Sequence, residues 1–146
     1  MPHKRLAAFL LAAALAGAPA ATVQAQELAG YVRHALEQME DEWAGRAYTH
    51  SYFIAQDSLQ QGGSWTQSFN SGAEAVTLVA GCDQDCSGLS MTVFDRASGR
   101  LLDQRRGYGK SMQMTVYPGA NRHLVAVLTM EGCATRVCYF ALTAVH

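Results

Sequence analysis

Four cysteines carry the most specific chemistry in this chain of 146 residues. They form two local pairs, Cys82-x3-Cys86 and Cys133-x4-Cys138, and each pair lies in a turn-like stretch. A turn brings its ends to the Cα separation of about 5.5–6 Å that a disulfide needs. We therefore expect the bonds Cys82–Cys86 and Cys133–Cys138 among the three connectivities that four cysteines permit. A zinc ion held by four thiolates is the alternative, but structural zinc sites usually have Cys-x2-Cys spacing or close variants.

Three aspartates near the first cysteine pair are the candidate metal ligands. Asp83 and Asp85 lie between Cys82 and Cys86, and Asp95 follows further along the chain. Calcium takes about six to eight oxygen ligands, which these carboxylates and main-chain carbonyls could supply. Aspartates in turns more commonly accept hydrogen bonds from turn amides. We therefore expect these three residues to be structural, and we expect no metal or other cofactor.

The histidines and serines show no familiar catalytic spacing. Four of the five histidines lie after residue 25, scattered at His34, His50, His123 and His146, and no His-x-x-x-His pair suggests a zinc hydrolase. No Gly-x-Ser-x-Gly sequence offers a nucleophilic serine between a strand and a helix. A triad assembled from distant positions would leave no such pattern and is the alternative. Because the familiar spacings are absent, we expect that the protein is not an enzyme.

Basic side chains gather between two expected strands, and this group comprises Arg96, Arg100, Arg105, Arg106 and Lys110. The simplest interpretation is a solvated hairpin face. The alternative is a basic edge that binds an acidic polymer, such as a cell-surface glycan or a phosphate-bearing one.

The composition limits the class of protein that presents these residues. Hydrophobic residues make up 49% of the chain and charged residues 16%, with a formal net charge of −1. This balance predicts one globular domain and excludes intrinsic disorder. A net charge near zero also argues against a dedicated nucleic-acid-binding protein, which usually has a basic face.

Residues 1–25 read as a secretory signal peptide. A cationic start, His3-Lys4-Arg5, precedes an apolar run over 6–16 and the small residues of Val23-Gln24-Ala25. The apolar run is shorter than the roughly 20 residues that span a bilayer. Few lysines beside many alanines, glycines and arginines are typical of a bacterial gene of high GC content. We therefore expect a periplasmic or secreted protein without stable membrane insertion after cleavage, in a compartment that favours disulfides.

The first testable prediction concerns processing. Protein recovered from the periplasm should begin at Gln26, or at the pyroglutamate formed from it, because small residues occupy the −3 and −1 positions before it. Intact-mass measurement and N-terminal peptide mapping test this. Recovery of a chain that still carries Met1 would contradict it.

Residues 26–46 predict an amphipathic helix. Its apolar side chains recur at helical spacing, and they are Leu28, Tyr31, Val32, Ala35, Leu36, Met39 and Trp43. Gly45 is a suitable stop. We expect this apolar face to pack on the rest of the domain. Pairing with another chain is the alternative, whereas binding to an anionic membrane is disfavoured by the mainly acidic polar face.

Residues 47–146 predict an antiparallel β-sandwich. Apolar residues alternate with polar ones over 65–69, 76–80, 89–93 and 112–116, with turn sequences between these segments. The segments 124–130 and 137–145 are apolar on both faces, which is typical of central strands. Short strands separated by glycine-rich turns indicate an all-β sandwich or barrel.

One segment resembles a known family. The residues Gly81-Cys82-Asp83-Gln84-Asp85-Cys86 precede Leu89-x-Met91-x-Val93-Phe94-Asp95 and then Gly99. This arrangement is similar to that of small secreted bacterial proteins related to the pre-peptidase C-terminal domain. The resemblance covers roughly 64–146 and implies a jelly-roll-like sandwich of about seven to eight strands. Gly88 and Ser90 stand where relatives carry aspartates, so it implies no calcium site there.

The expected function follows from these features. The family consists mostly of accessory modules, and a fold does not by itself specify an activity. We expect an exported, non-catalytic binding or accessory module whose partner is a protein or a cell-envelope glycan and not a nucleic acid. The alternatives are a small periplasmic hydrolase or metal-dependent enzyme, and a periplasmic inhibitor or chaperone of a protein partner.

Overall fold

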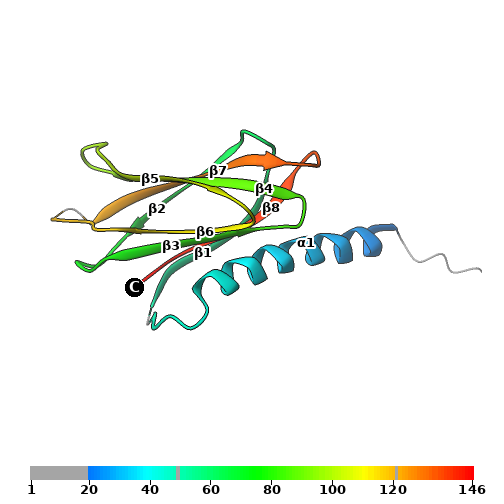
Figure 1. Cartoon of the computed structure of the whole chain (residues 1–146), viewed down its shortest axis with the longest axis horizontal. Helices are drawn as coiled ribbons and strands as arrows, with labels where there is room; N and C mark the ends of the chain where they lie inside the picture. Colours follow the sequence, from blue (N-terminus) through cyan, green and yellow to red (C-terminus); the bar gives the residue numbers. More distant parts are fainter. Residues whose placement is uncertain (1–19, 49, 121) are drawn as a thin grey trace, which may run out of the picture.

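The structure, a computed structural model, describes residues 20–48, 50–120 and 122–146 (Figure 1). In these ranges one helix precedes eight strands. The elements are α1 (Ala20–Trp43), β1 (Ser51–Leu59), β2 (Ser64–Asn70), β3 (Val76–Cys82), β4 (Cys86–Asp95), β5 (Leu101–Tyr108), β6 (Ser111–Val116), β7 (His123–Cys133) and β8 (Cys138–Val145).

The strands form two antiparallel sheets of four. One has the order β1-β8-β3-β6, and the other has the order β2-β7-β4-β5. Strands from the two ends of the chain pair successively inward, β1 with β8, β2 with β7, β3 with β6 and β4 with β5. The chain therefore folds back on itself as one long wrapped hairpin, which is the jelly-roll arrangement of eight strands. The expected jelly-roll-like antiparallel sandwich is confirmed.

The main core lies between the two sheets. Alternate side chains of each strand point inward, as the pleat requires. The largest buried side chains include Phe140, Leu78, Leu89, Leu128 and the four methionines Met91, Met112, Met114 and Met130. As expected, β7 and β8 are central strands in their sheets.

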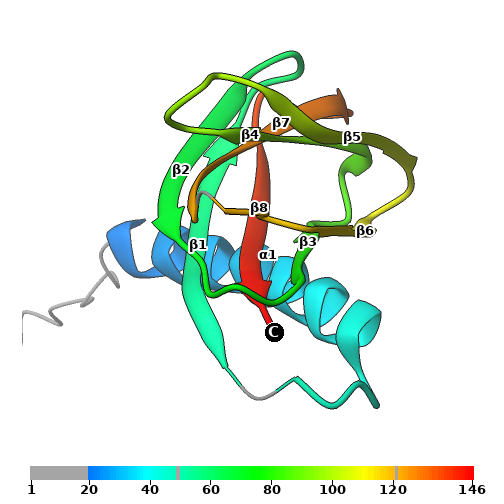
Figure 2. The ribbon, with the colours of Figure 1, turned by 90° about the vertical axis from the view of Figure 1, so that its left-hand side faces the viewer.

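The helix covers the outer face of the β1-β8-β3-β6 sheet, which we call the helix-side sheet (Figure 2). Ala35 and Met39 are buried there against Val79, Ala141 and Val145 in a second, smaller core. This packing explains why β8 is buried on both faces. It also confirms that the apolar face of the helix packs on the domain.

A glycine allows the helix to approach this closely. A Cβ atom on Gly81 of β3 would lie 2.4 Å from the Ala35 carbonyl oxygen and 2.4 Å from the Met39 backbone nitrogen. Real Cβ atoms do not approach backbone atoms this closely, so the helix can rest on β3 at this point only because the side chain is absent.

The helix boundaries differ from the expected 26–46. The helix begins at Ala20, because the alanine-rich residues before Gln26 favour helix. It ends at Trp43, shortly before Gly45, whose φ of 74° is left-handed and stops the helix. Residues 1–19 of the expected signal peptide lie outside the described residues. Within those residues, no helix is long and apolar enough to cross a membrane.

Candidate functional site

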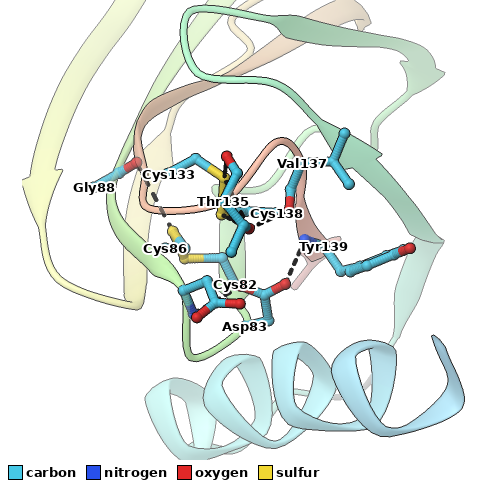
Figure 3. The surroundings of a disulfide bond; sticks show 10 residues. Cys82, Asp83, Cys86, Gly88, Cys133, Thr135, Val137, Cys138 and Tyr139 are labelled. Atoms are coloured by element: carbon cyan, nitrogen blue, oxygen red, sulfur yellow. Dashed lines mark hydrogen bonds between the residues drawn. A yellow bond between two sulfur atoms is a disulfide. The ribbon is translucent and has the colours of Figure 1, made fainter. Parts of the chain in front are cut away.

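The two disulfides lie side by side at one end of the sandwich (Figure 3). Cys82 bonds to Cys86 and Cys133 bonds to Cys138, with Cα separations of 5.9 and 5.8 Å. Cys86 and Cys133 also face each other in the β4–β7 register, so the two closed turns are neighbours. Both expected pairings are confirmed, and the structure holds no free cysteine in the described residues.

Asp83 connects these turns to β8. Asp83 is 1% exposed, and its carboxylate accepts a hydrogen bond from the backbone nitrogen of Tyr139 at 2.7 Å (Figure 3). The same carboxylate accepts a second bond from the backbone nitrogen of Asp85 at 3.1 Å. The carbonyl of Asp85 in turn accepts a bond from the Ala134 nitrogen in the second disulfide turn. Asp83 therefore orders the disulfide end of the molecule, as the turn interpretation predicted.

Asp95 does not join the other two aspartates. It ends β4, whereas Asp83 and Asp85 precede the start of that strand, and ten extended residues separate the ends by about 30 Å. The hydrogen bond that the Ser98 backbone nitrogen donates to the Asp95 carboxylate lowers the pKa of that carboxyl below its usual value. Burial opposes this shift, while the backbone hydrogen bond from Ala97 and the positive charge of Arg100 reinforce it. The structure therefore does not bring Asp83, Asp85 and Asp95 together as the alternative of a calcium site would require. The described residues hold no group of three His, Cys, Asp or Glu side chains suited to a metal ion.

The basic residues are also divided. Arg96 and Arg100 lie in the β4–β5 turn, whereas Lys110 follows β5 at the disulfide end. Arg105 and Arg106 lie within β5 itself, on opposite faces, because side chains alternate along a strand. The structure therefore does not bring the five residues together as one basic edge, because the unrecognised strand β5 passes through this segment.

The helix does not cover the outer face of the β2-β7-β4-β5 sheet. We call it the open face, and it is made of outward side chains on β2, β7, β4 and β5 that the register places on one side: Ser64, Thr66, Ser68, Asn70, Ser90, Thr92, Phe94, Gln104, Arg106, Tyr108, His123, Val125, Val127, Thr129 and Glu131. Figures 1 and 2 show this sheet on the side of the sandwich away from α1. Most of these side chains carry a hydroxyl or an amide.

Hydrogen bonds link side chains across the strands of the open face. The Ser64 and Thr129 hydroxyls are 2.7 Å apart, and the Ser90 hydroxyl donates to Glu131 at 2.6 Å. Glu131 also pairs with Arg106 at 3.4 Å, which balances the two charged groups of the face against each other. Cross-strand contacts of this kind hold side chains in fixed positions on a rigid sheet.

Tyr108 stands at one end of the open face. It is 92% exposed and is the last residue of β5, opposite Gly88 of β4. An aromatic ring exposed to this degree at the end of a strand offers an apolar surface with a hydroxyl at its tip. The open face thus combines fixed polar side chains with one uncovered aromatic ring.

A second group of candidate residues lies where the first strand meets the last. His50 and His146 exchange backbone hydrogen bonds just before β1 and just after β8, and their ring centroids are 5.3 Å apart. With Tyr52 they line a hollow of about 560 Å³ that Glu74 also borders. No local pattern indicates this pair, because its members are brought together only by the pairing of the first strand with the last.

Comparisons with known proteins add little to this geometry. No protein-family model and no curated protein matches the chain. Among solved structures, a periplasmic inhibitor of g-type lysozyme from Aeromonas hydrophila is 17% identical, with a TM-score of 0.43, over 66% of this chain and 85% of that one. A carbohydrate-binding module of lichenase 5A from Cellvibrio mixtus, in complex with cellotriose, is 11% identical, with a TM-score of 0.43, over 75% and 94%.

A third similar structure is a disulfide-linked pilus of Bacillus endospores, at 15% identity and a TM-score of 0.33, covering 68% of this chain and 92% of that one. Similarity this low assigns neither a family nor a function. The resemblance to the pre-peptidase C-terminal domain stays a prediction. The class that the geometry defines is a disulfide-bonded, eight-stranded antiparallel β-sandwich with one sheet covered by a helix and the other open.

Proposed function

We propose that the protein is an exported, non-catalytic binding module that recognises an uncharged cell-envelope glycan on its open face. The observation that carries this proposal is the open face itself, a broad sheet surface of hydroxyl and amide side chains with Tyr108 at one end. The location rests on the expected signal peptide and is supported by the two disulfides, which persist in an oxidising compartment.

The chemistry of the open face suits sugar hydroxyls. A serine or threonine hydroxyl both donates and accepts hydrogen bonds, as a sugar hydroxyl does. Such side chains line β2 and β4, and the apolar side chains of Val125 and Val127 lie between them on β7. Because the strands are rigid, little conformational entropy is lost when a ligand binds them.

The charge of the open face favours an uncharged ligand over an acidic one. Arg106 is paired with Glu131, so its positive charge is already balanced. Arg96 and Arg100 lie in the turn beyond the sheet and do not extend this surface into a basic edge. A strongly acidic polymer would therefore find no continuous row of cations along the open face.

The test of this proposal is binding of the mature protein to an array of uncharged oligosaccharides. Tyr108→Ala should weaken binding about tenfold, which corresponds to about 1.4 kcal/mol, because exposed aromatic residues often dominate binding surfaces. Thr92→Arg, which places a long cation in the middle of the face, should also weaken it.

The matched control is Tyr117→Ala. This tyrosine is 77% exposed but follows β6, away from the open face, so its loss should leave binding unchanged. Equal binding by all three variants would contradict the proposal, as would the absence of binding by the unaltered protein. The second outcome would turn attention to the inhibitor, chaperone and enzyme hypotheses.

A further inference from the structure

Two histidines from the opposite ends of the sandwich domain meet in the helix-side sheet. The His50 nitrogen donates to the His146 carbonyl at 3.2 Å, and the His146 nitrogen donates to the His50 carbonyl at 3.1 Å. Residues that exchange both hydrogen bonds face each other directly, with Cβ atoms about 4.5–5.5 Å apart on the same side of the sheet. The two imidazoles accordingly lie next to each other, with their planes inclined at 50°.

Tyr52 supports this pair. Its ring lies 5.4 Å from the His50 ring and 5.2 Å from the His146 ring, measured between centroids. Its hydroxyl accepts a hydrogen bond from the Gly72 nitrogen at 3.0 Å, which holds the ring in place. The packed tyrosine restricts the orientations that both imidazoles can adopt.

We propose that His50 and His146 chelate a divalent transition-metal ion, with Cu²⁺ preferred over Ni²⁺ and Zn²⁺. Imidazole nitrogen is a suitable ligand for all three ions, and divalent copper is generally bound most tightly. Two imidazoles on one ion, with metal–nitrogen distances of about 2.0–2.1 Å, place their ring centroids about 4.5–5.2 Å apart. The observed 5.3 Å is close to this spacing.

The other coordination positions fall to water, and the Glu74 carboxylate, which borders the same hollow of about 560 Å³, adds a negative charge near the ion. No third His, Cys, Asp or Glu ligand is already in place beside this pair in the described residues. The site is therefore a two-imidazole chelate that the sheet preorganises, and folding does not depend on its occupation. It is independent of the proposed glycan binding, because His50 and His146 extend the helix-side sheet.

The experiment is calorimetric titration of untagged protein with CuCl₂, NiCl₂ and ZnCl₂ at about pH 7.5, where the ordinary imidazole is neutral. One ion should bind per chain. His50→Asn and His146→Asn should each weaken binding at least tenfold, and Glu74→Gln should weaken it less. Asparagine keeps the backbone hydrogen bonds of the pair, and a thermal melt of each variant verifies that it is folded.

His123→Asn is the matched control, because His123 lies on the open face and contacts Asn70. Binding by this variant should equal that of the unaltered protein. In NMR spectra, sub-stoichiometric Cu²⁺ should broaden the imidazole signals of His50 and His146 first. Undetectable binding by the unaltered protein would overturn the proposal, as would tight binding that persists in the variant lacking both histidines.

Discussion

Replacing Asp83 by alanine should lower the free energy of unfolding by about 3–5 kcal/mol. The buried carboxylate accepts hydrogen bonds from the backbone nitrogens of Tyr139 and Asp85, and each bond to a charged group contributes about 1.5–3 kcal/mol. Alanine leaves the Tyr139 N–H without its acceptor where the disulfide end joins β8. Urea denaturation of the oxidised protein measures the change.

Two further variants separate the hydrogen bonds from other effects. Asp83→Asn keeps the shape of the side chain but turns an NH₂ group toward one of the two backbone donors, so it should also be clearly destabilising. Asp85→Ala removes a half-exposed carboxylate that makes no hydrogen bond or ion pair found among the described residues, and should change stability by no more than about 0.5 kcal/mol. Equal stabilities of Asp83→Ala and Asp85→Ala would show that the Asp83 contacts contribute little.

Replacing Gly81 by alanine should destabilise the protein by about 1–3 kcal/mol, the usual cost of overpacking. The added Cβ would lie 2.4 Å from backbone atoms of Ala35 and Met39, and a helix backbone cannot move aside as the end of a flexible side chain can. The helix must therefore shift away from β3 and loosen the small core around Met39 and Val79. Urea denaturation measures the loss, and hydrogen exchange of the amides over 30–43 reports whether the helix is its source.

Gly30→Ala is the matched control, because it makes the same substitution in the helix that Gly81 contacts. A Cβ on Gly30 meets nothing within 4 Å, so alanine should stabilise the helix by about 0.5–1 kcal/mol. The two glycine variants thus have opposite expected signs. If Gly81→Ala were as stable as the unaltered protein, the close contact between α1 and β3 would be refuted.

Much of the fold could be predicted because it depends on neighbouring residues. Each disulfide closes a short turn, so the spacing of the cysteines was enough to pair them. Strands buried on one face or both carry their periodicity in the sequence, and β2, β3, β4, β6, β7 and β8 were all anticipated. The apolar stripe of the helix likewise predicted the face that packs on the sheet.

Two strands, β1 and β5, were not assigned from the sequence because few of their side chains are buried. β1 and β5 each border a sheet, and most of their residues are exposed or only half-buried. Strands with so little burial impose no clear apolar alternation, whereas the other two edge strands, β2 and β6, bury alternate residues and were recognised. The placement of Arg105 and Arg106 between two strands, and not within one, followed from the missing β5.

The sequence by itself determined the turns, the disulfides and the periodicity of the buried strands, since each of these arises from contacts over a few residues. Only the tertiary structure decided which strands pair, because the β1–β8 and β2–β7 pairings join distant segments. That pairing separates Asp95 from Asp83, opposes His50 to His146 and gathers the open face from four strands. It also places Gly81 beneath the helix, a contact that the sequence indicates only by a glycine within a buried strand. Such arrangements depend on the registers of strands far apart in the chain, and no local pattern of residues specifies those registers.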